Sequence, residues 1–283
     1  MMPSRRDFLQ LSAKAAVFLI TPKGAVKYFM SAANKLPPVE DVILRFAVCS
    51  DGHYGQPNTY YDVYHDDMIK SLNAEKEARG LHFTTINGDL FHNDPKFLPI
   101  VKKKWDALNM PYYVSHGNHD MVVPDVWEKV WGMPMSHTFE YGQTGFIIVD
   151  TADDMGNYIC PPDMNWVKKS LKKFESKKHV FVFMHIPGVK SWSPYAIDCP
   201  EILELFAAQN NLRAVYHGHD HTIDSRHEYK GKSFFFDAHL GGDWGTPYKG
   251  YRITEVLKNG NILTYQLDAQ TAKTMNQDTI APG

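Results

Sequence analysis

The chain has 283 residues, and its 30 basic and 32 acidic side chains give a formal net charge of -2. This balance supplies no basic field that would favour a nucleic-acid polymer or an anionic membrane as a partner. A hydrophobic content of 43% is that of a globular protein with a sizeable core, and the 14 histidines stand out because imidazole is a common metal ligand.

The first 33 residues have the features of an export signal. Residues 4–9 read SRRDFL and resemble the twin-arginine signal, and a weakly apolar stretch interrupted by Lys14 follows them. That stretch is too short to span a bilayer comfortably. The resemblance implies passage through the twin-arginine translocation machinery and an exported or periplasmic location. Small residues at 31–33 suit cleavage after Ala33, and an amphipathic N-terminal helix is the alternative.

The next part of the chain alternates between strands and helices. Residues 42–50 are a continuous apolar run rich in β-branched side chains, which indicates a buried strand. A helix is predicted next, with Val63, Met68, Ile69 and Leu72 at helical spacing. The predicted order is strand 42–50, helix 61–79, strand 82–88, helix 96–109 and strand 111–118.

The second half repeats the alternation and then changes. We expect a hairpin over 137–151, a helix over 164–173, strands over 179–187 and 212–219, and a helix over 201–210 between those strands. Beyond residue 222, short apolar runs between glycine turns indicate antiparallel strands over 233–238, 250–257 and 261–267.

This order of elements favours one domain over residues 40–270. The expected fold class is α/β, a four-layer sandwich in which two mixed β-sheets are flanked by helices. Residues 271–283 carry no apolar pattern and are expected to form a flexible tail.

The three cysteines do not form a metal-binding spacing such as Cys-x-x-Cys. Cys49 ends an apolar strand and is expected to be a buried thiol. Cys160 and Cys199 lie beside prolines in predicted loops, where an exported protein permits a disulfide between them. Sequence alone leaves all three possible pairings open.

Polar side chains of one chemical kind follow five successive apolar runs. Because the carboxyl ends of strands in α/β sheets converge on one crevice, these side chains can meet in space. Oxygen and imidazole ligands without thiolate suit Mn, Fe, Zn or similar divalent ions, and more than four ligands favour two ions over one. The residues are Asp51, His53, Asp89, Asn118, His119, His185, His219 and His221.

Over residues 42–221 the motifs DGH, GD, GNHD, MHIP and GHDH resemble those of the calcineurin-like metallophosphoesterases, in the same order. The resemblance implies two divalent ions and the fold of that family. It assigns Asp51, His53 and His221 to one ion, Asn118, His185 and His219 to the other, and Asp89 as the carboxylate that bridges them.

The same resemblance gives His119 the role of general acid, which protonates the leaving oxygen after a metal-bridging hydroxide attacks phosphorus. Asp120 is either a partner of His119 or a structural residue. His217 points away from the ligands and is expected to support or pack. The purple acid phosphatase branch has a tyrosine at the position of His92, so the histidine argues against that branch. His92 is expected to support the metal ligands.

The substrate is expected to be a small phosphomonoester or phosphodiester, since substrate choice depends on loops. It would be nucleotide-like if the nearby aromatic side chains stack a base. The alternative is that these rings cover loop cores. A non-catalytic metal-binding or ligand-binding member of the same fold is the alternative to an enzyme. The aromatic residues are Tyr54, Trp192, Tyr195 and Trp244.

Overall fold

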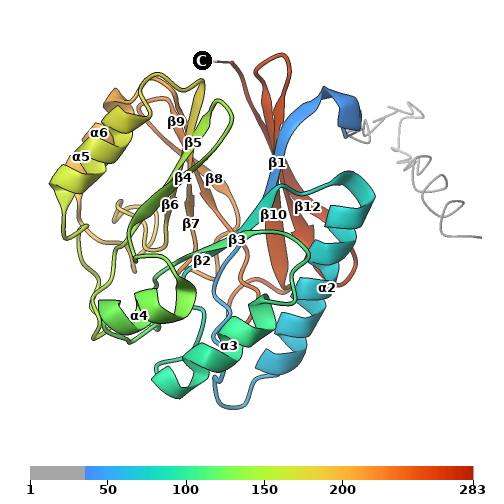
Figure 1. Ribbon diagram of the computed structural model, residues 1–283, viewed down its shortest axis with the longest axis vertical. Coiled ribbons are helices and arrows are strands. Elements are labelled where there is room, and N and C mark those ends of the chain that lie inside the picture. The colour runs from blue at the N-terminus through green and yellow to red at the C-terminus, as the bar shows by residue number, and fades with distance from the viewer. Residues whose placement is uncertain (1–35, 283) are drawn as a thin grey trace, which may run out of the picture. The chain divides into compact units, whose positions relative to one another are not determined.

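The computed structural model describes residues 36–282 (Figure 1). The predicted export signal lies outside the described residues. Residues 36–41 contain a single 3₁₀ turn, η2 (Val39–Asp41), and the compact unit that carries the elements described below begins at Val42. Among residues 36–282, no helix combines the length and apolar character that a membrane span requires.

The first sheet is mixed and has the strand order β12-β11-β10-β1-β2-β3. Its parallel half is formed by β1 (Val42–Cys49), β2 (Phe83–Asn87) and β3 (Tyr112–Ser115). Its antiparallel half is formed by β10 (Gly250–Leu257), β11 (Ile262–Asp268) and β12 (Thr274–Ile280). All the predicted strands before residue 119 therefore lie side by side in this sheet.

The second sheet has the order β4-β5-β6-β7-β9-β8. Its strands are β4 (His137–Tyr141), β5 (Thr144–Val149), β6 (His179–Met184), β7 (Leu212–His217), β8 (Arg226–Tyr229) and β9 (Lys232–Phe236). β5, β6, β7 and β9 run parallel. The expectation of purely antiparallel pairing beyond residue 222 is wrong for β9, because the β8–β9 hairpin returns the chain alongside β7 in the same direction.

The two sheets face each other across an aromatic core. Side chains alternate along β1, as its pleat requires: Phe46 and Val48 face the core between the sheets, whereas Ala47 and Cys49 face the helices. Phe46 stacks on Phe83 with ring centroids 5.1 Å apart. This alternation gives β1 two apolar faces, as expected for a strand buried on both sides.

Helices cover both outer faces and complete the four layers (Figure 1). Three helices pack on the first sheet: α2 (Tyr61–Arg79), α3 (Leu98–Trp105) and α4 (Pro124–Trp131). A 3₁₀ turn, η3 (Pro95–Phe97), precedes α3. α5 (Met164–Lys173) and α6 (Pro200–Ala208) pack on the second. The expected four-layer α/β fold is confirmed.

On α2 the buried face differs by one residue from the predicted face. Met68, Ile69 and Leu72 are buried, but Val63 is 53% exposed. His65 takes its place, because positions 65, 68, 69 and 72 follow the i, i+3, i+4, i+7 spacing of one helical face. His65 is therefore a core residue, and its Nδ1 donates to the carbonyl oxygen of Tyr61 at 2.7 Å.

Three elements were not predicted: α4, β8 and β12. The expectation of a flexible tail over 271–283 is wrong, since β12 pairs antiparallel with β11 at the sheet edge. Its side chains are mostly polar and half-exposed, and backbone pairing is supplemented by hydrogen bonds of Asn276 with Arg252 and with the carbonyl oxygen of Asp224. α4 does have local signals, with Pro124 in its first turn and Gly132 in a left-handed conformation after its end.

Candidate metal centre

The predicted metal ligands meet at the carboxyl ends of β1, β2, β3, β6 and β7. Two fully buried groups of three possible ligands form there, and a third, less buried group joins His53 to His92 and His119; within each group the ligand atoms lie within 4.8 Å of one another. One fully buried group is Asp51, His53 and His221, and the other is Asp89, His185 and His219. All seven predicted ligands are buried, including Asn118. The two fully buried groups match the division into two ions that the resemblance implies.

Asp89 lies where a bridging carboxylate is needed. Its Oδ2 is 3.2 Å from Nε2 of His185 in its own group and 3.6 Å from Nε2 of His53 in the other. Within the first group, Nε2 of His221 is 3.1 Å from both Asp51 Oδ1 and His53 Nε2. One carboxylate therefore reaches both groups.

Two of the predicted ligands have a buried polar atom that makes no hydrogen bond with the protein, Oδ1 of Asn118 and Nε2 of His219, and Nε2 of His185 has only its ionic contacts with Asp89 and Asp51. An unsatisfied buried polar atom costs about 1–3 kcal/mol. These three atoms belong to the residues assigned to the second ion, and a divalent cation would satisfy all of them. The donor set fits metal binding.

Hydrogen bonds on the far side of the imidazole rings fix which nitrogen faces the centre. Nδ1 of His185 lies 2.7 Å from the carbonyl oxygen of Asn87, and Nδ1 of His221 lies 3.2 Å from that of Trp244. Nδ1 of His53 lies 3.1 Å from Nδ1 of His92. Each contact leaves Nε2 free for a metal, which is the usual arrangement around metal-binding histidines. His92 therefore contacts a predicted ligand, and its supporting role stays a prediction, since it also belongs to the group with His53 and His119.

Backbone strain is concentrated at the same residues. Four of the ligands have positive φ angles: Asp51 at 59°, His53 at 44°, Asp89 at 53° and His219 at 69°. Side chains other than glycine rarely adopt this left-handed region, and each such residue costs about 1–3 kcal/mol. The sharp turns that this conformation produces bring each side chain from its strand end toward the centre.

Glycines beside the ligands allow the loops to approach one another. At Gly88, whose φ is 84°, an added Cβ would lie 2.3 Å from the ring of His185. At Gly117 it would lie 2.2 Å from the backbone nitrogen of Asp89. The glycines in the GD and GN motifs are therefore required by contacts between the ligand loops.

Electrostatic interactions favour the charged forms of the two carboxylates. Burial opposes ionisation of Asp89, but His185 and His119 hold the pKa of that carboxyl well below its usual range. Burial alone would lower the pKa of His185, yet the carboxylates of Asp89 and Asp51 raise it to about 9. A histidine binds a metal through its neutral form, so a cation and a proton would compete for His185.

His119, the predicted general acid, lies beside the two ligand groups. Its backbone N–H donates to Asp89 Oδ1 at 2.8 Å, and its ring lies 4.7 Å from that of His53, measured between centroids. Nδ1 of His119 lies 2.7 Å from Oδ1 of Asn93, a residue that the sequence reasoning missed. The amide oxygen of Asn93 accepts the Nδ1 proton, which leaves Nε2 as the reactive nitrogen.

Asp120 has a structural role and is not a partner of His119. Its carboxylate is buried and accepts from the backbone N–H groups of Phe91 at 3.0 Å and Gly117 at 2.9 Å. His217 is also structural, since its Nδ1 bonds to the carbonyl oxygen of Met184 at 2.7 Å and its ring stacks on Phe234. Neither side chain contacts His119.

Two of the four predicted substrate contacts face the interior instead. Tyr54 is buried in the core beneath α2, and its hydroxyl donates to Asp62 at 2.7 Å. Trp192 packs against Phe234 and His227 on the outer face of the second sheet. For these two residues the alternative that aromatic rings cover loop cores is correct.

The other two predicted aromatic contacts border the centre. Trp244 lies flat on the ring of His221, with centroids 4.2 Å apart, and Tyr195 stands edge-on to His219 at 6.1 Å. The structure adds Tyr158, whose ring is edge-on to His219 at 4.6 Å. No local pattern in the sequence distinguished Tyr158, because it follows a strand that ends nine residues earlier at Val149.

A disulfide joins the loops that carry these two tyrosines. Cys160 and Cys199 are bonded, with their Cα atoms 5.7 Å apart, and Cys49 is a buried free thiol. Of the three possible pairings, the structure has the one between the proline-flanked cysteines. The bridge lies two residues after Tyr158 and four residues after Tyr195.

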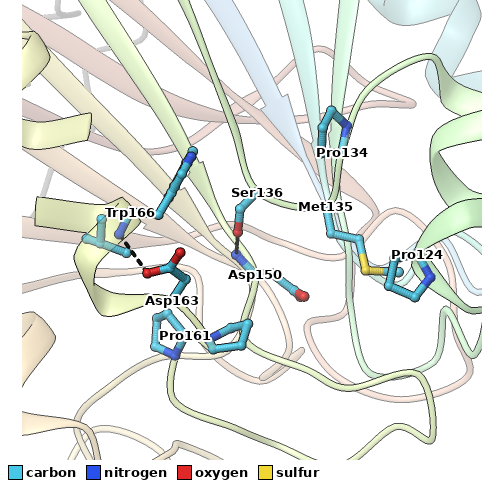
Figure 2. A pocket seen from close by; sticks show the side chains of 10 residues that line it. Pro124, Pro134, Met135, Ser136, Asp150, Pro161, Asp163 and Trp166 are labelled. Atoms are coloured by element: carbon cyan, nitrogen blue, oxygen red, sulfur yellow. Dashed lines mark hydrogen bonds between the residues drawn. The ribbon is translucent and has the colours of Figure 1, made fainter. Parts of the chain in front are cut away.

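A separate pocket of about 280 Å³ lies between α4 and α5 (Figure 2). Its lining is mostly apolar, including Met135, Pro161 and Trp166. The carboxylates that border it are already engaged, because Asp150 bonds to His116 at 3.0 Å and Asp163 caps the first turn of α5. None of the predicted ligands lines this pocket.

Solved structures share the fold at low sequence identity. A dimetal phosphatase from Danio rerio aligns with a TM-score of 0.69 and 12% identity over 86% of this chain and 100% of that chain. GAP50, the anchor in the inner membrane complex of Plasmodium, gives 0.64 and 14% over 85% and 89%. The purple acid phosphatase PPD1 of yellow lupin gives 0.67 and 11% over 93% of this chain and 58% of that chain.

A comparison with curated protein sequences found no match. The model of the calcineurin-like phosphoesterase family, in contrast, matches residues 44–222, which is more than half of the chain. This range begins within β1 and ends just after His221, so it includes every predicted ligand. The chain belongs to the calcineurin-like phosphoesterase family and is a metal-dependent phosphoester hydrolase.

Proposed function

We propose that this enzyme binds two divalent ions and hydrolyses a small phosphate monoester or diester. The observation that carries the proposal is the pair of adjacent buried ligand groups, with Asp89 of one group 3.6 Å from His53 of the other. The unpaired atoms of Asn118 and His219 support a second ion beside the first. Mn, Fe, Zn or a similar ion suits ligands of this kind.

The mechanism divides between the ions and the side chains around them. Two divalent ions would supply Lewis acidity for the phosphoryl oxygens and activate the attacking water. Asp89 holds both ligand groups at one spacing, and the bonds to Nδ1 keep the histidine rings directed at the centre. Phosphoryl transfer depends mainly on such positioning and on electrostatic stabilisation.

His119 is proposed to donate a proton to the leaving oxygen. Asn93 holds Nδ1, and the contact between the backbone N–H of His119 and Asp89 ties the imidazole to the ligand groups. A protonated Nε2 next to the ions can then reach the ester oxygen that departs from phosphorus. No covalent intermediate with a protein side chain is required.

The fold alone does not establish catalysis, because it also occurs in a protein described as an anchor. A non-catalytic binding protein would have no need for a proton donor beside a complete ligand set. The presence of His119 and of all seven ligands therefore favours the enzyme.

Metal analysis combined with an ester screen tests the proposal. We expect two ions per chain, hydrolysis of aryl phosphates, and a clear preference when mono-aryl and bis-aryl phosphates are compared. His119→Ala should retain both ions and lose turnover by about 10²–10⁴-fold. His227→Ala, on β8 at the sheet edge, is the matched control and should retain both. One ion per chain, or full activity in His119→Ala, would contradict the mechanism.

We further propose that the protein is exported by the twin-arginine pathway. The disulfide between Cys160 and Cys199 supports an oxidising compartment. Replacing Arg5 and Arg6 by lysine should retain the protein in the cytoplasm, as fractionation would show. An unchanged distribution would exclude this route.

A further inference from the structure

Exposed aromatic side chains gather at the metal centre. Among the described residues, the large exposed aromatic groups are Tyr60 at 74%, Tyr158 at 43%, Tyr195 at 45% and Trp244 at 41%. Three of these four contact a metal-binding histidine or each other, and only Tyr60 does not. Exposed apolar surface that is concentrated at one place indicates a binding site.

The three rings form a defined arrangement, here called the aromatic rim (Tyr158, Tyr195 and Trp244). The indole of Trp244 is nearly parallel to His221, at 8°. The ring of Tyr195 is edge-on to that indole, with centroids 6.0 Å apart. Tyr158 stands almost perpendicular to His219, at 87°. The rim therefore borders His219 and His221, one ligand from each group.

Trp244 keeps surface that a ligand can contact. It is 41% exposed, although His221 covers one face of its indole and Tyr195 stands edge-on to the ring. Rings that only fill loop cores are buried, as Tyr54 is here, whereas the three rim residues retain more than 40% exposure. Covering the metal centre does not account for that exposed area.

The rim is also held in place before any ligand binds. The backbone N–H of Tyr195 donates to Ser193 Oγ at 3.1 Å, and that hydroxyl donates to the buried carboxylate of Asp220 at 2.6 Å. Tyr158 pairs with Ala152 in a short bridge next to the end of β5. The disulfide then ties the Tyr158 loop to the Tyr195 loop. Preorganised rings lose little entropy when they stack on a ligand.

We propose that the aromatic rim binds a planar aromatic ring of the substrate next to the reacting phosphate, an inference that rests on the proposed function. The substrate class is therefore a phosphate ester that carries a flat ring, attached directly or through a sugar, as in a nucleotide. Stacking on such rings tolerates different ring types, since it requires only a π-face.

The test compares pairs of esters that differ only in the ring. Adenosine 5′-monophosphate and ribose 5-phosphate have the same kind of leaving oxygen, and benzyl and cyclohexylmethyl phosphate form a second pair without sugar. With the metal-loaded enzyme we expect kcat/KM to favour the ring-bearing member by about 5- to 100-fold. Trp244→Ala should reduce that ratio toward one, Trp244→Phe should keep most of it, and Tyr60→Ala should leave it unchanged.

The first pair identifies nucleotides and the second identifies simple aryl-bearing esters, so preference in either pair supports the rim. Equal kcat/KM within both pairs, or an unchanged preference in Trp244→Ala, would overturn the proposal. Binding of adenosine and of ribose to the metal-loaded protein, measured by calorimetry, gives a readout without turnover. If no ester is hydrolysed but adenosine binds and Trp244→Ala abolishes binding, the proposed function fails while the rim stands.

Discussion

Replacing Asn93 by glycine tests whether His119 acts as a proton donor. Oδ1 of Asn93 lies 2.7 Å from Nδ1 of His119, and the backbone N–H of Asn93 donates to the carbonyl oxygen of His119 at 2.9 Å. Glycine is the suitable replacement because Asn93 has a φ of 63°, where alanine would add backbone strain. Asn93→Gly therefore removes the side-chain contact and retains the backbone contact.

The size of the effect follows from that single contact. The acid form of His119 is charged, and a hydrogen bond to a charged group contributes about 1.5–3 kcal/mol, which corresponds to a loss of about 12- to 160-fold in rate if it acts fully in the transition state. Removing the acid itself in His119→Ala should cost about 10²–10⁴-fold. Asn93→Asp keeps an oxygen acceptor at the same position and should recover most of the loss.

The assay measures kcat for aryl phosphates whose leaving groups span several pKa values. Protonation matters most for poor leaving groups, so the loss in Asn93→Gly and His119→Ala should grow as the pKa of the leaving phenol rises. Metal content is measured on the same samples and should not change. An equal loss for every leaving group would show that Asn93 positions something other than an acid.

Three further changes test the centre and the fold around it. Asp89→Asn should lower the affinity for both ions. Loss of a hydrogen-bonding partner outside the ligand shell costs about 10–100-fold in metal affinity, and loss of a bridging ligand should cost more. If metal analysis finds that only one ion is lost, Asp89 does not bridge. Burial lowers the pKa of His65 to about 4, below its value near 6.5 in the unfolded chain. The unfolded chain therefore binds a proton at a higher pH than the folded protein does. Through this group, the free energy of unfolding falls by about 3 kcal/mol as the pH drops from about 6.5 to about 4. His65→Gln should flatten that part of the stability profile in urea unfolding, and an unchanged slope would place the titrating group elsewhere. Replacing Cys160 and Cys199 by serine should cost about 2–4 kcal/mol, since the bridge closes a 39-residue separation, and reduced wild-type protein should unfold at the same urea concentration as the variant.

The fold could be predicted wherever side-chain periodicity reports burial. β1, α2, α5 and β10 occur within a residue of their predicted ranges because their apolar patterns match one or two buried faces. β12 could not be predicted in this way. It is held by backbone pairing with β11 and by hydrogen bonds from Asn276 to residues distant in the sequence, and neither produces an apolar periodicity.

The same difference separates the metal ligands from the substrate contacts. A residue within two positions of the end of a buried parallel strand is placed by that strand, so the positions of Asp51, Asp89 and His185 follow from the order of elements. The direction of a side chain further along a loop depends on turns that the sequence does not reveal. Tyr54 therefore faces the core, whereas Tyr158 borders the centre.

Three features that each oppose folding occur at one edge of the protein. Each feature reduces the stability of the fold: left-handed backbone at four ligands, buried polar atoms without hydrogen bonds, and exposed aromatic rings. The physical causes differ, since the first is backbone strain, the second is desolvation of polar atoms and the third is exposure of apolar surface to water. A bound cation would relieve the second cost, and a stacked planar ligand would relieve the third. Any ligand that binds the folded protein more tightly than the unfolded chain stabilises the fold, so both proposed ligands should raise the free energy of unfolding.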